Sequence, residues 1–265
     1  MDDALSVGLN SVSMEYGQLV RKLKRKEQAV ITPSRLKREI GKGDIRFANK
    51  EPQDAHELLA GLLDLMKGES VAKRSIGRYL STVRCMSCSF ESSTEVEEQC
   101  ISLPLVSKPN VTVHDCLKEY FAAEAIPLSE GVRCYGCGHV VSAQKTLTIE
   151  TSPELLLIHL KRFAYVDGRM KKVETNVGVP SNVAVPGAKY QLAGVVKHSG
   201  SKNSGHYVAD IRTKMGWLTL DDDLVKKTKG KRMSWCPYSY LLFYIKENVN
   251  QVPDTPSDRR APPHL

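Results

Sequence analysis

Two pairs of cysteines constrain the fold of this chain more than any other sequence feature. Each pair has two residues between its cysteines: Cys85 with Cys88, and Cys134 with Cys137. Four thiolates suit a tetrahedral zinc ion, and this spacing lets both sulfurs of a pair reach one ion. Because residues 89–133 separate the pairs, a gap too long for a compact zinc finger, we expect each pair at the tip of its own hairpin, with a sheet bringing the tips together. Four thiols without a metal are the alternative.

The number of cysteines and the lack of a visible sorting segment indicate a reducing compartment. Seven is an odd number of cysteines, which argues against a framework of disulfides. No signal peptide follows Met1, and no apolar run is long enough to span a bilayer. We therefore expect an intracellular protein, cytoplasmic and/or nuclear, without a membrane partner.

Hydrophobic periodicity predicts an α+β fold, with helices first and an antiparallel sheet after them. Apolar residues at helical spacing predict helices over 12–29, over 34–42 and between Pro52 and Gly68. A capping box of Thr112 and Asp115 predicts one more helix. The predicted strands are a pair within 84–105 and the segments 155–163, 190–199, 206–213, 217–220 and 240–245.

Two runs of basic residues account for much of the net charge of +8, at 21–26 and 226–232. Such runs could bind phosphate or an acidic protein, or they could be solvated surface. The first run contains no aromatic residue on which a base could stack, so a nucleic-acid partner is not favoured. A zinc-ribbon protein that binds nucleic acid is kept as an alternative from another functional class.

A histidine and an aspartate have the spacing of a catalytic base and the group that orients it. His206 begins a predicted strand after Gly205, and Asp221 follows fifteen residues later, after one hairpin. On neighbouring strands, the carboxylate could accept a hydrogen bond from Nδ1 of the imidazole, which would then withdraw a proton from a thiol. Two ordinary polar residues of a hairpin would have the same spacing. His159, inside a predicted strand, is interpreted as a hydrogen-bonded structural histidine.

Taken in order, several motifs resemble the catalytic domain of ubiquitin-specific proteases over residues 12–246. They are PQDAHELL at 52–59, the two cysteine pairs, LIHLKRF at 157–163, HSG at 198–200 with SGHY at 204–207, Trp217 with the Asp221-Asp222 pair, and YLLFY at 240–244. The resemblance implies a papain-like fold with a helical thumb at 1–68, zinc-ribbon fingers at 69–152 and a β palm at 153–246. Residues 247–265 are rich in proline and are expected to be a disordered tail.

The resemblance also assigns roles to individual residues. It implies that His206 is the catalytic base, that Asp221 orients it and that Asp222 assists. It implies that Cys85, Cys88, Cys134 and Cys137 hold one structural zinc ion. The ubiquitin-binding residues would be Gln53, Asp54, His198 and Tyr207, and the reaction would be hydrolysis of the (iso)peptide bond at the C-terminal glycine of ubiquitin.

The sequence departs from the family where the nucleophile is expected. The nucleophilic cysteine of ubiquitin-specific proteases precedes the segment matched by 52–59, but residues 1–51 contain no cysteine. We expect an N-terminally truncated form that is inactive alone, or else a non-catalytic ubiquitin-binding pseudoprotease. The truncation would uncover the apolar face of Leu58, Leu62 and Leu63 and lower solubility. A monomer is expected.

Overall fold

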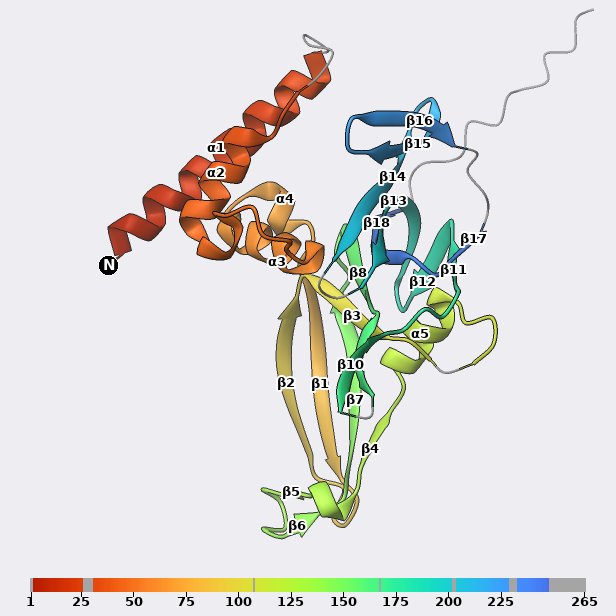
Figure 1. Cartoon of the computed structure of the whole chain (residues 1–265). Coiled ribbons are helices and arrows are strands. Elements are labelled where there is room, and N and C mark those ends of the chain that lie inside the picture. Colours follow the sequence, from red (N-terminus) through yellow and green to blue (C-terminus); the bar gives the residue numbers. More distant parts are fainter. Residues whose placement is uncertain are drawn as a thin grey trace, which may run out of the picture.

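The computed structural model describes residues 2–25, 31–106, 108–166, 168–201, 204–228 and 233–247. Helices and sheets occupy separate parts of it, so the predicted α+β class is confirmed (Figure 1). The helices of residues 2–73, called here the helical region, lie on one side of the molecule. A long, narrow arm of strands points away from them, and a larger sheet, the main sheet, lies on the other side.

The helical region is built around one small apolar core. Its elements are α1 (Asp2–Arg25), α2 (Ser34–Gly43), the 3-10 turn η1 (Ile45–Phe47), α3 (Ala55–Leu65) and α4 (Ser70–Lys73). Val12, Ile40, Phe47 and Leu63 are among the buried residues that join the first helices to one another. The first helix begins ten residues before the predicted start at 12 and is described to Arg25, and the predicted residues 26–29 lie outside the described residues.

The arm is a four-stranded antiparallel sheet in the order β2-β1-β7-β4. Its strands are β1 (Gly77–Cys85), β2 (Glu91–Glu98), β4 (Glu124–Ile126) and β7 (Ala143–Thr151). The turn η2 (Leu128–Glu130) and the small hairpin of β5 (Val132–Arg133) and β6 (Val140–Val141) lie at its tip. The predicted pair of strands within 84–105 is wrong at its start, because the first strand of the hairpin begins at Gly77.

The main sheet has eight strands, seven of them in the order β16-β15-β14-β13-β18-β8-β3. They are β3 (Cys100–Pro104), β8 (Leu155–Lys161), β13 (Ala188–Gly200), β14 (Gly205–Thr213), β15 (Gly216–Asp221), β16 (Leu224–Thr228) and β18 (Ser239–Lys246), with β12 (Asn182–Val185) paired to β13. The sheet is antiparallel as predicted except at its edge, where β3 runs parallel to β8. The predicted strand 155–163 is interrupted at Arg162, because β8 ends at Lys161 and β9 begins at Phe163.

Smaller elements complete the structure around this sheet. They are helix α5 (Val113–Tyr120), the hairpin of β9 (Phe163–Val166) and β10 (Arg169–Lys172), and the pair of β11 (Val177–Pro180) and β17 (Met233–Cys236). The capping box of Thr112 and Asp115 is present as predicted, and it starts α5. Val113, Cys116 and Leu117 on that helix join the largest core, which also buries the main-sheet residues Leu156 and Leu242.

Some expectations are not decided by this architecture. The division into a thumb, fingers and a palm at 68, 152 and 246 stays a prediction. The predicted disordered tail lies outside the described residues except for Glu247. Among the described helices, none combines the length and the apolar character needed to cross a bilayer.

Candidate active site and metal site

His206 and Asp221 meet on neighbouring strands of the main sheet. His206 follows Gly205 at the start of β14 and Asp221 ends β15, and the two strands pair from Ala209 opposite Leu220 to Thr213 opposite Gly216. Nε2 of His206 lies 2.6 Å from Oδ1 of Asp221. The predicted pairing is therefore present, but the prediction that Nδ1 faces the carboxylate is wrong. Among the described residues, Nδ1 of His206 has no hydrogen-bond partner, so this is the nitrogen that can take up a proton.

Electrostatics at the pair favour the protonated imidazole. The hydrogen bond to Asp221 raises the pKa of His206 above its ordinary value against a smaller opposing effect of desolvation, and the charges of Asp221 and Asp222 raise it further. Asp222 is exposed and stands in the left-handed region with φ of 49°. One ligand atom from each of His206, Asp221 and Asp222 lies within 4.8 Å of the others. The three residues predicted as catalytic are thus neighbours.

A cavity of about 500 Å³ lies between the start of α3 and the main sheet, and its lining includes Gly205 and Tyr207, the chain neighbours of His206. All four residues predicted to bind ubiquitin line it, namely Gln53, Asp54, His198 and Tyr207. Its remaining lining includes His56, which belongs to the motif at 52–59, His159, which was interpreted as structural, and Tyr240, which was assigned no role. The cavity therefore joins four segments that are distant in sequence: the start of α3, β8, the β13–β14 hairpin and β18.

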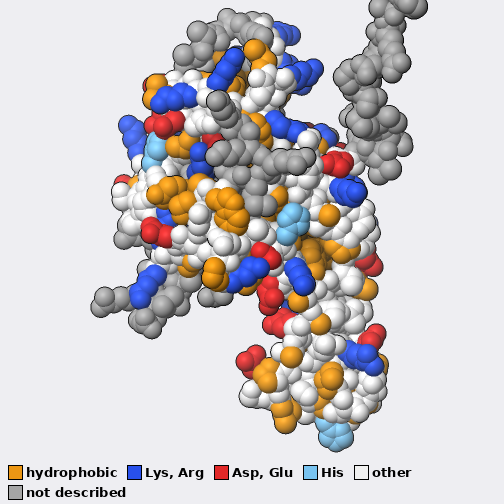
Figure 2. Space-filling model, turned by 90° about the vertical axis from the view of Figure 1, so that its right-hand side faces the viewer, with side chains coloured by type: hydrophobic (Ala, Val, Ile, Leu, Met, Phe, Trp, Pro, Cys, Tyr) orange, Lys and Arg blue, Asp and Glu red, His pale blue; other side chains and the backbone are white. Residues whose placement is uncertain are grey.

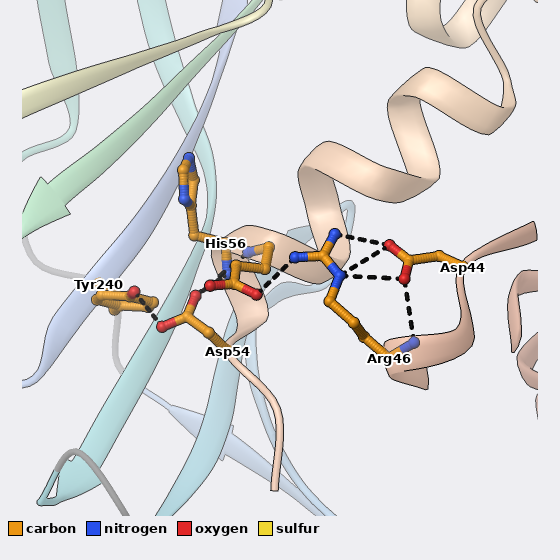
Figure 3. Close-up of polar contacts among 6 residues, drawn as sticks. Asp44, Arg46, Asp54, His56 and Tyr240 are labelled. Carbon is orange, nitrogen blue, oxygen red and sulfur yellow. Dashed lines mark hydrogen bonds and ion pairs between the residues drawn. The ribbon is translucent and has the colours of Figure 1, made fainter. Parts of the chain in front are cut away.

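Asp54 connects the helical region to the main sheet (Figure 3). Its Oδ1 caps α3 by accepting hydrogen bonds from the backbone N–H groups of His56 at 2.7 Å and Glu57 at 3.2 Å. Its Oδ2 accepts a hydrogen bond of 2.6 Å from the Tyr240 hydroxyl of β18. Burial and the Asp54 carboxylate raise the pKa of Tyr240, so its hydroxyl stays a donor. One side chain thus fixes both the start of a helix and the wall of the cavity.

Arg46 holds the outer side of the same helix. Its guanidinium pairs with Asp44 at 2.6 Å (Figure 3). It also pairs with Glu57 of α3 at 2.9 Å. The Arg46 and Glu57 side chains are each about half exposed, so the pair adds little stability. Its effect is to keep Glu57 turned toward η1 while the Asp54 carboxylate of the same turn faces Tyr240.

His198 lines the cavity and has a buried ring nitrogen without a partner in the described part of the chain. Only 4% of its surface is exposed, and its Nδ1 has no hydrogen-bond partner among the described residues. Its ring lies against Tyr207, with the centroids 4.7 Å apart. Burial and then the charge of Lys172 lower the pKa of His198, so the neutral ring is favoured. A buried polar atom without a partner is costly, so Nδ1 is suited to a hydrogen bond with a ligand.

His56 and His159 stack in the wall of the cavity, with ring centroids 4.0 Å apart. The Ser102 hydroxyl lies 3.0 Å from Nδ1 of His159. The interpretation of His159 as a hydrogen-bonded histidine is confirmed at this contact, although the ring also lines the cavity. Burial, and then the adjacent His56, lower the pKa of His159 to about 4. Its ring is therefore neutral near pH 7.

The four cysteines of the two pairs come together at the tip of the arm. Cys85 ends β1, Cys88 lies in the following turn, and Cys134 and Cys137 belong to the turn between β5 and β6. All four sulfurs lie within 4.8 Å of one another, and the sulfurs of Cys88 and Cys134 are 3.6 Å apart. A tetrahedral zinc ion with bonds of about 2.3 Å would place its sulfurs about 3.8 Å apart. The cluster could therefore hold a metal ion.

The surroundings of this cluster suit thiolates. Backbone N–H groups of Ser87 and Cys88 donate to the sulfur of Cys85 at 3.4 Å, and that of Gly136 donates to the sulfur of Cys134 at 3.3 Å. The Cys88 N–H, above all, lowers the pKa of the Cys85 thiol. Against the opposing Phe90 N–H, burial and the neighbouring cysteines raise the pKa of Cys88, so a metal ion would be needed to hold Cys88 as a thiolate. The core of the tip holds little besides cysteine, namely Cys85, Cys134 and Val141 with Cys137 against them. Hydrophobic burial alone gives this tip little stability.

Several apolar side chains around the cluster face solvent. Tyr135 is 88% exposed, and Met86 and Val140 are more than half exposed. Figure 2 shows hydrophobic side chains on the narrow lobe formed by the arm. These side chains do not pack inward, so they add little to the small core between the two turns.

No cysteine is in a position to serve His206. Four of the seven form the cluster on the arm, and Cys100 lies on β3 at the opposite edge of the main sheet from β15 and β16. Cys116 is buried in the largest core, and Cys236 lies on β17, which pairs with β11 outside that sheet. Cys100, Cys116 and Cys236 are therefore not placed to act as the nucleophile beside His206.

Comparison with known proteins identifies the family. The model of the family described as "Ubiquitin carboxyl-terminal hydrolase" matches residues 2–244. The chain belongs to this family. The expectation drawn from the sequence motifs, a catalytic domain of the ubiquitin-specific protease type, is confirmed.

Two curated family members illustrate the degree of similarity. Ubiquitin carboxyl-terminal hydrolase 4 of Saccharomyces cerevisiae is 30% identical over 197 residues, which cover 63% of this chain and 21% of the yeast protein. Ubiquitin carboxyl-terminal hydrolase 4 of Arabidopsis thaliana is 27% identical over 252 residues, covering 76% of this chain and 68% of that protein. The chain therefore spans about a fifth of the yeast family member.

Solved structures of the family share the fold. The Ubp8 DUB module of SAGA bound to ubiquitin aldehyde contains a chain that matches with a TM-score of 0.75 and 23% identity over 91% of this chain and 60% of that one. The module bound to monoubiquitin matches with a TM-score of 0.71 and 24% identity over 82% of this chain and 53% of that one. The predicted papain-like fold is thus confirmed. The intracellular location and the monomeric state stay predictions.

Proposed function

We propose that this chain is the part of a deubiquitinase catalytic domain that binds ubiquitin and carries the catalytic base with its orienting acid. The observation that supports this most is the hydrogen bond between His206 and Asp221 beside a cavity lined by Gln53, Asp54, His198 and Tyr207. A family resemblance alone would leave open whether the site geometry survives in this chain. A base oriented by an acid is the arrangement that thiol-dependent acyl transfer needs.

In the proposed reaction, Nδ1 of His206 takes the proton of a cysteine thiol while Asp221 holds Nε2–H. The thiolate attacks the carbonyl carbon of the C-terminal glycine of ubiquitin, and the imidazolium gives its proton to the departing amine. Water then attacks the thioester with His206 again as base, which releases ubiquitin and restores the thiol. Asp222 acts at a distance, because its charge favours the imidazolium that forms in each step.

The cavity is proposed to bind the extended C-terminal tail of ubiquitin. Nδ1 of His198 would exchange its unpaired state for a hydrogen bond with the backbone of the tail. The carboxylates of Asp54 and Glu57 at one side of the cavity would favour a tail that carries positive charge. Tyr207 closes the same side, because its hydroxyl accepts a hydrogen bond from the backbone N–H of Ala55 at 3.3 Å.

The thiol is proposed to come from polypeptide outside this sequence. A mainly apolar groove of about 410 Å³ is lined by Leu36, Ile40, Phe47, Leu58 and Leu62 of the helical region, and Gln53 lines both this groove and the cavity. Leu58 is 39% exposed and Leu63 is buried, so the expected uncovered face includes Leu58 and not Leu63. A segment seated in this groove would have its end beside the cavity. Without it, the chain is expected to be inactive and poorly soluble.

The cluster of four cysteines is proposed to hold one structural zinc ion. Its role would be to order the two turns at the tip of the arm, away from the reacting groups. It takes no part in the proton transfers of His206.

Hydrolysis of a fluorogenic ubiquitin C-terminal amide by the purified chain tests this proposal. We expect that the chain shows no thiol-dependent release of the fluorophore but binds ubiquitin measurably. Thiol-dependent turnover by the chain alone would overturn the proposed inactivity, and failure to bind ubiquitin would overturn the proposed function.

A non-catalytic ubiquitin-binding protein is the second candidate, favoured by the lack of a cysteine near His206. The intact mass and N-terminal sequence of the endogenous protein separate the two: a cysteine-bearing extension before Met1 supports the enzyme, and a mass of 29.5 kDa supports the binding protein.

A further inference from the structure

Lys172 makes two backbone contacts close to the catalytic base, although it lies outside the main sheet. It ends β10, and its Nζ donates hydrogen bonds of 2.9 Å to the carbonyl oxygens of His198 and Gly200. The ammonium also lies 5.9 Å from the centre of the Tyr238 ring. Hydrogen bonds from a charged donor are stronger than neutral ones, so the contact holds β13 firmly at this point.

These two carbonyls flank the residue that lies opposite the base. In the register of β13 and β14, Ser199 pairs with His206 and Gly200 pairs with Gly205. Gly200 has φ of +109°, and neither it nor Gly205 has a side chain that could anchor this end of the hairpin. The bonds from Lys172 therefore fix the backbone against which His206 is aligned.

A second anchor holds the same segment through its N–H side. The backbone N–H of His198 donates to the carbonyl oxygen of Tyr238 at 2.8 Å. The turn that contains Tyr238 is itself held by Arg162, whose fully buried guanidinium donates to the carbonyl oxygens of Cys236 and Ser239. Lys172 and Arg162 thus hold residues 198–200 of β13 from two directions.

We propose that Lys172 is a positioning residue for the catalytic base: its ammonium fixes the carbonyls of His198 and Gly200, and through the paired strand it keeps the His206 imidazole within hydrogen-bond distance of Asp221. The proposal rests on the proposed role of His206 as the base. The proposal predicts that His206 loses its hydrogen bond to Asp221 when the two hydrogen bonds from Lys172 are removed. Lys172 itself touches neither of these two side chains.

The titration of His206, followed by NMR of the ring protons in the full 265-residue chain, tests this proposal. The signal is assigned by its absence in His206→Gln. Lys172→Met keeps the length of the side chain and removes both donors, and Lys172→Arg keeps the charge and can donate to both carbonyls. Lys214→Met is the matched control, because Lys214 is an exposed lysine in the turn after β14 and loses the same charge.

The direction of the shift distinguishes positioning from simple electrostatics. The groups facing His206 are the carboxylates of Asp221 and Asp222. Removing a nearby positive charge alone would raise the pKa of His206, whereas separating the ring from Asp221 would lower it. We expect Lys172→Met to lower this pKa by about half a unit or more, Lys172→Arg to restore it, and Lys214→Met to leave it unchanged.

An unchanged or raised pKa of His206 in folded Lys172→Met would overturn the proposal. If that variant does not fold, Lys172→Leu, which also removes both donors, is titrated instead, and the same outcomes decide. Ubiquitin binding is measured on the unsubstituted chain in parallel. If the unsubstituted chain does not bind ubiquitin, the proposed function is wrong. The titration of His206 tests the role of Lys172 whether or not ubiquitin binds.

Discussion

Asp221 accepts its hydrogen bond from Nε2 of His206, at 2.6 Å, and this leaves Nδ1 as the nitrogen that can receive a proton. The contact fixes the tautomer, because a neutral ring that donates from Nε2 has its lone pair on Nδ1. It also sets the direction from which a thiol must approach: the side of the ring away from β15. The predictions below follow from this pair and from the contacts around it.

Asp221→Asn is expected to lower the pKa of His206 and to change how stability depends on pH. The pKa of His206 is raised in the folded chain, so its protonated form stabilises the fold. This stabilisation is fully present below the ordinary histidine pKa of about 6.5 and is lost as the pH rises through the folded value. The difference in unfolding free energy between the unsubstituted chain and Asp221→Asn should therefore be larger near pH 5.5 than near pH 9, measured by urea unfolding.

Asp223→Asn is the control for that experiment. Asp223 is exposed in the same turn, and its substitution removes the same charge. The unfolding free energy of Asp223→Asn should therefore depend on pH as that of the unsubstituted chain does. If His206 has the same pKa in Asp221→Asn as in the unsubstituted chain, the hydrogen bond to Asp221 is not what raises that pKa.

Removal of the metal ligands is expected to unfold the tip of the arm. The chain should contain one zinc ion, measured by elemental analysis, and the double variant Cys88→Ser with Cys137→Ser should contain none. Because the tip has a core of only Cys85, Cys134 and Val141 with Cys137 against them, we expect loss of protection from amide exchange there. Cys236→Ser, which changes a cysteine outside the cluster, should keep the ion. Equal zinc content in all three proteins would exclude the cluster as the site.

Asp54→Ala is expected to lower the free energy of unfolding by about 2 kcal/mol, since it removes both the cap of α3 and the acceptor of Tyr240. Tyr240→Phe removes only the second contact and should cost about 1 kcal/mol. Asp64→Ala, at an exposed position of the same helix, should have little effect. Urea unfolding measures all three, and a cost of Asp54→Ala no larger than that of Asp64→Ala would contradict the connection between the helical region and the main sheet.

Gly205→Ala is expected to displace His198. A Cβ at position 205 would overlap the His198 ring and would lie 2.7 Å from the carbonyl oxygen of Ser199. We expect a cost of about 2 kcal/mol in unfolding free energy, as for an overpacked core, and weaker binding of ubiquitin. Gly68→Ala is the matched control, since a Cβ there meets nothing within 4 Å. Equal stability and equal binding for both variants would contradict the close approach of Gly205 to His198.

The parts of the site that sequence reasoning predicted are those set by local rules. A histidine at the start of one strand and an acid at the end of the next lie close together because a hairpin joins the strands, so spacing suggested the pair and the family resemblance gave His206 and Asp221 their roles. The two cysteine pairs were predicted for a similar reason, since each turn arranges its own two sulfurs. The choice of Nε2 over Nδ1 depends on the ring rotamer, which spacing does not determine.

The parts that were missed depend on contacts between distant segments. The stack of His56 on His159 and the bond from Tyr240 to Asp54 form only when α3 meets the main sheet. The parallel pairing of β3 with β8 was missed because both strands are short and apolar, and nothing in their pattern sets a direction. Most of β2 is exposed on both faces, so it lacks the alternation of apolar residues that marks a strand, and the extent of its hairpin with β1 was underestimated.

The most direct test of the central claim is a calorimetric titration of the chain with ubiquitin, compared with a titration using ubiquitin that lacks its C-terminal glycines. The account predicts saturable binding of intact ubiquitin and clearly weaker binding of the shortened form, because the tail would occupy the cavity beside His206. Absence of binding to intact ubiquitin, or equal binding of the two forms, would contradict the claim that this cavity receives the ubiquitin tail.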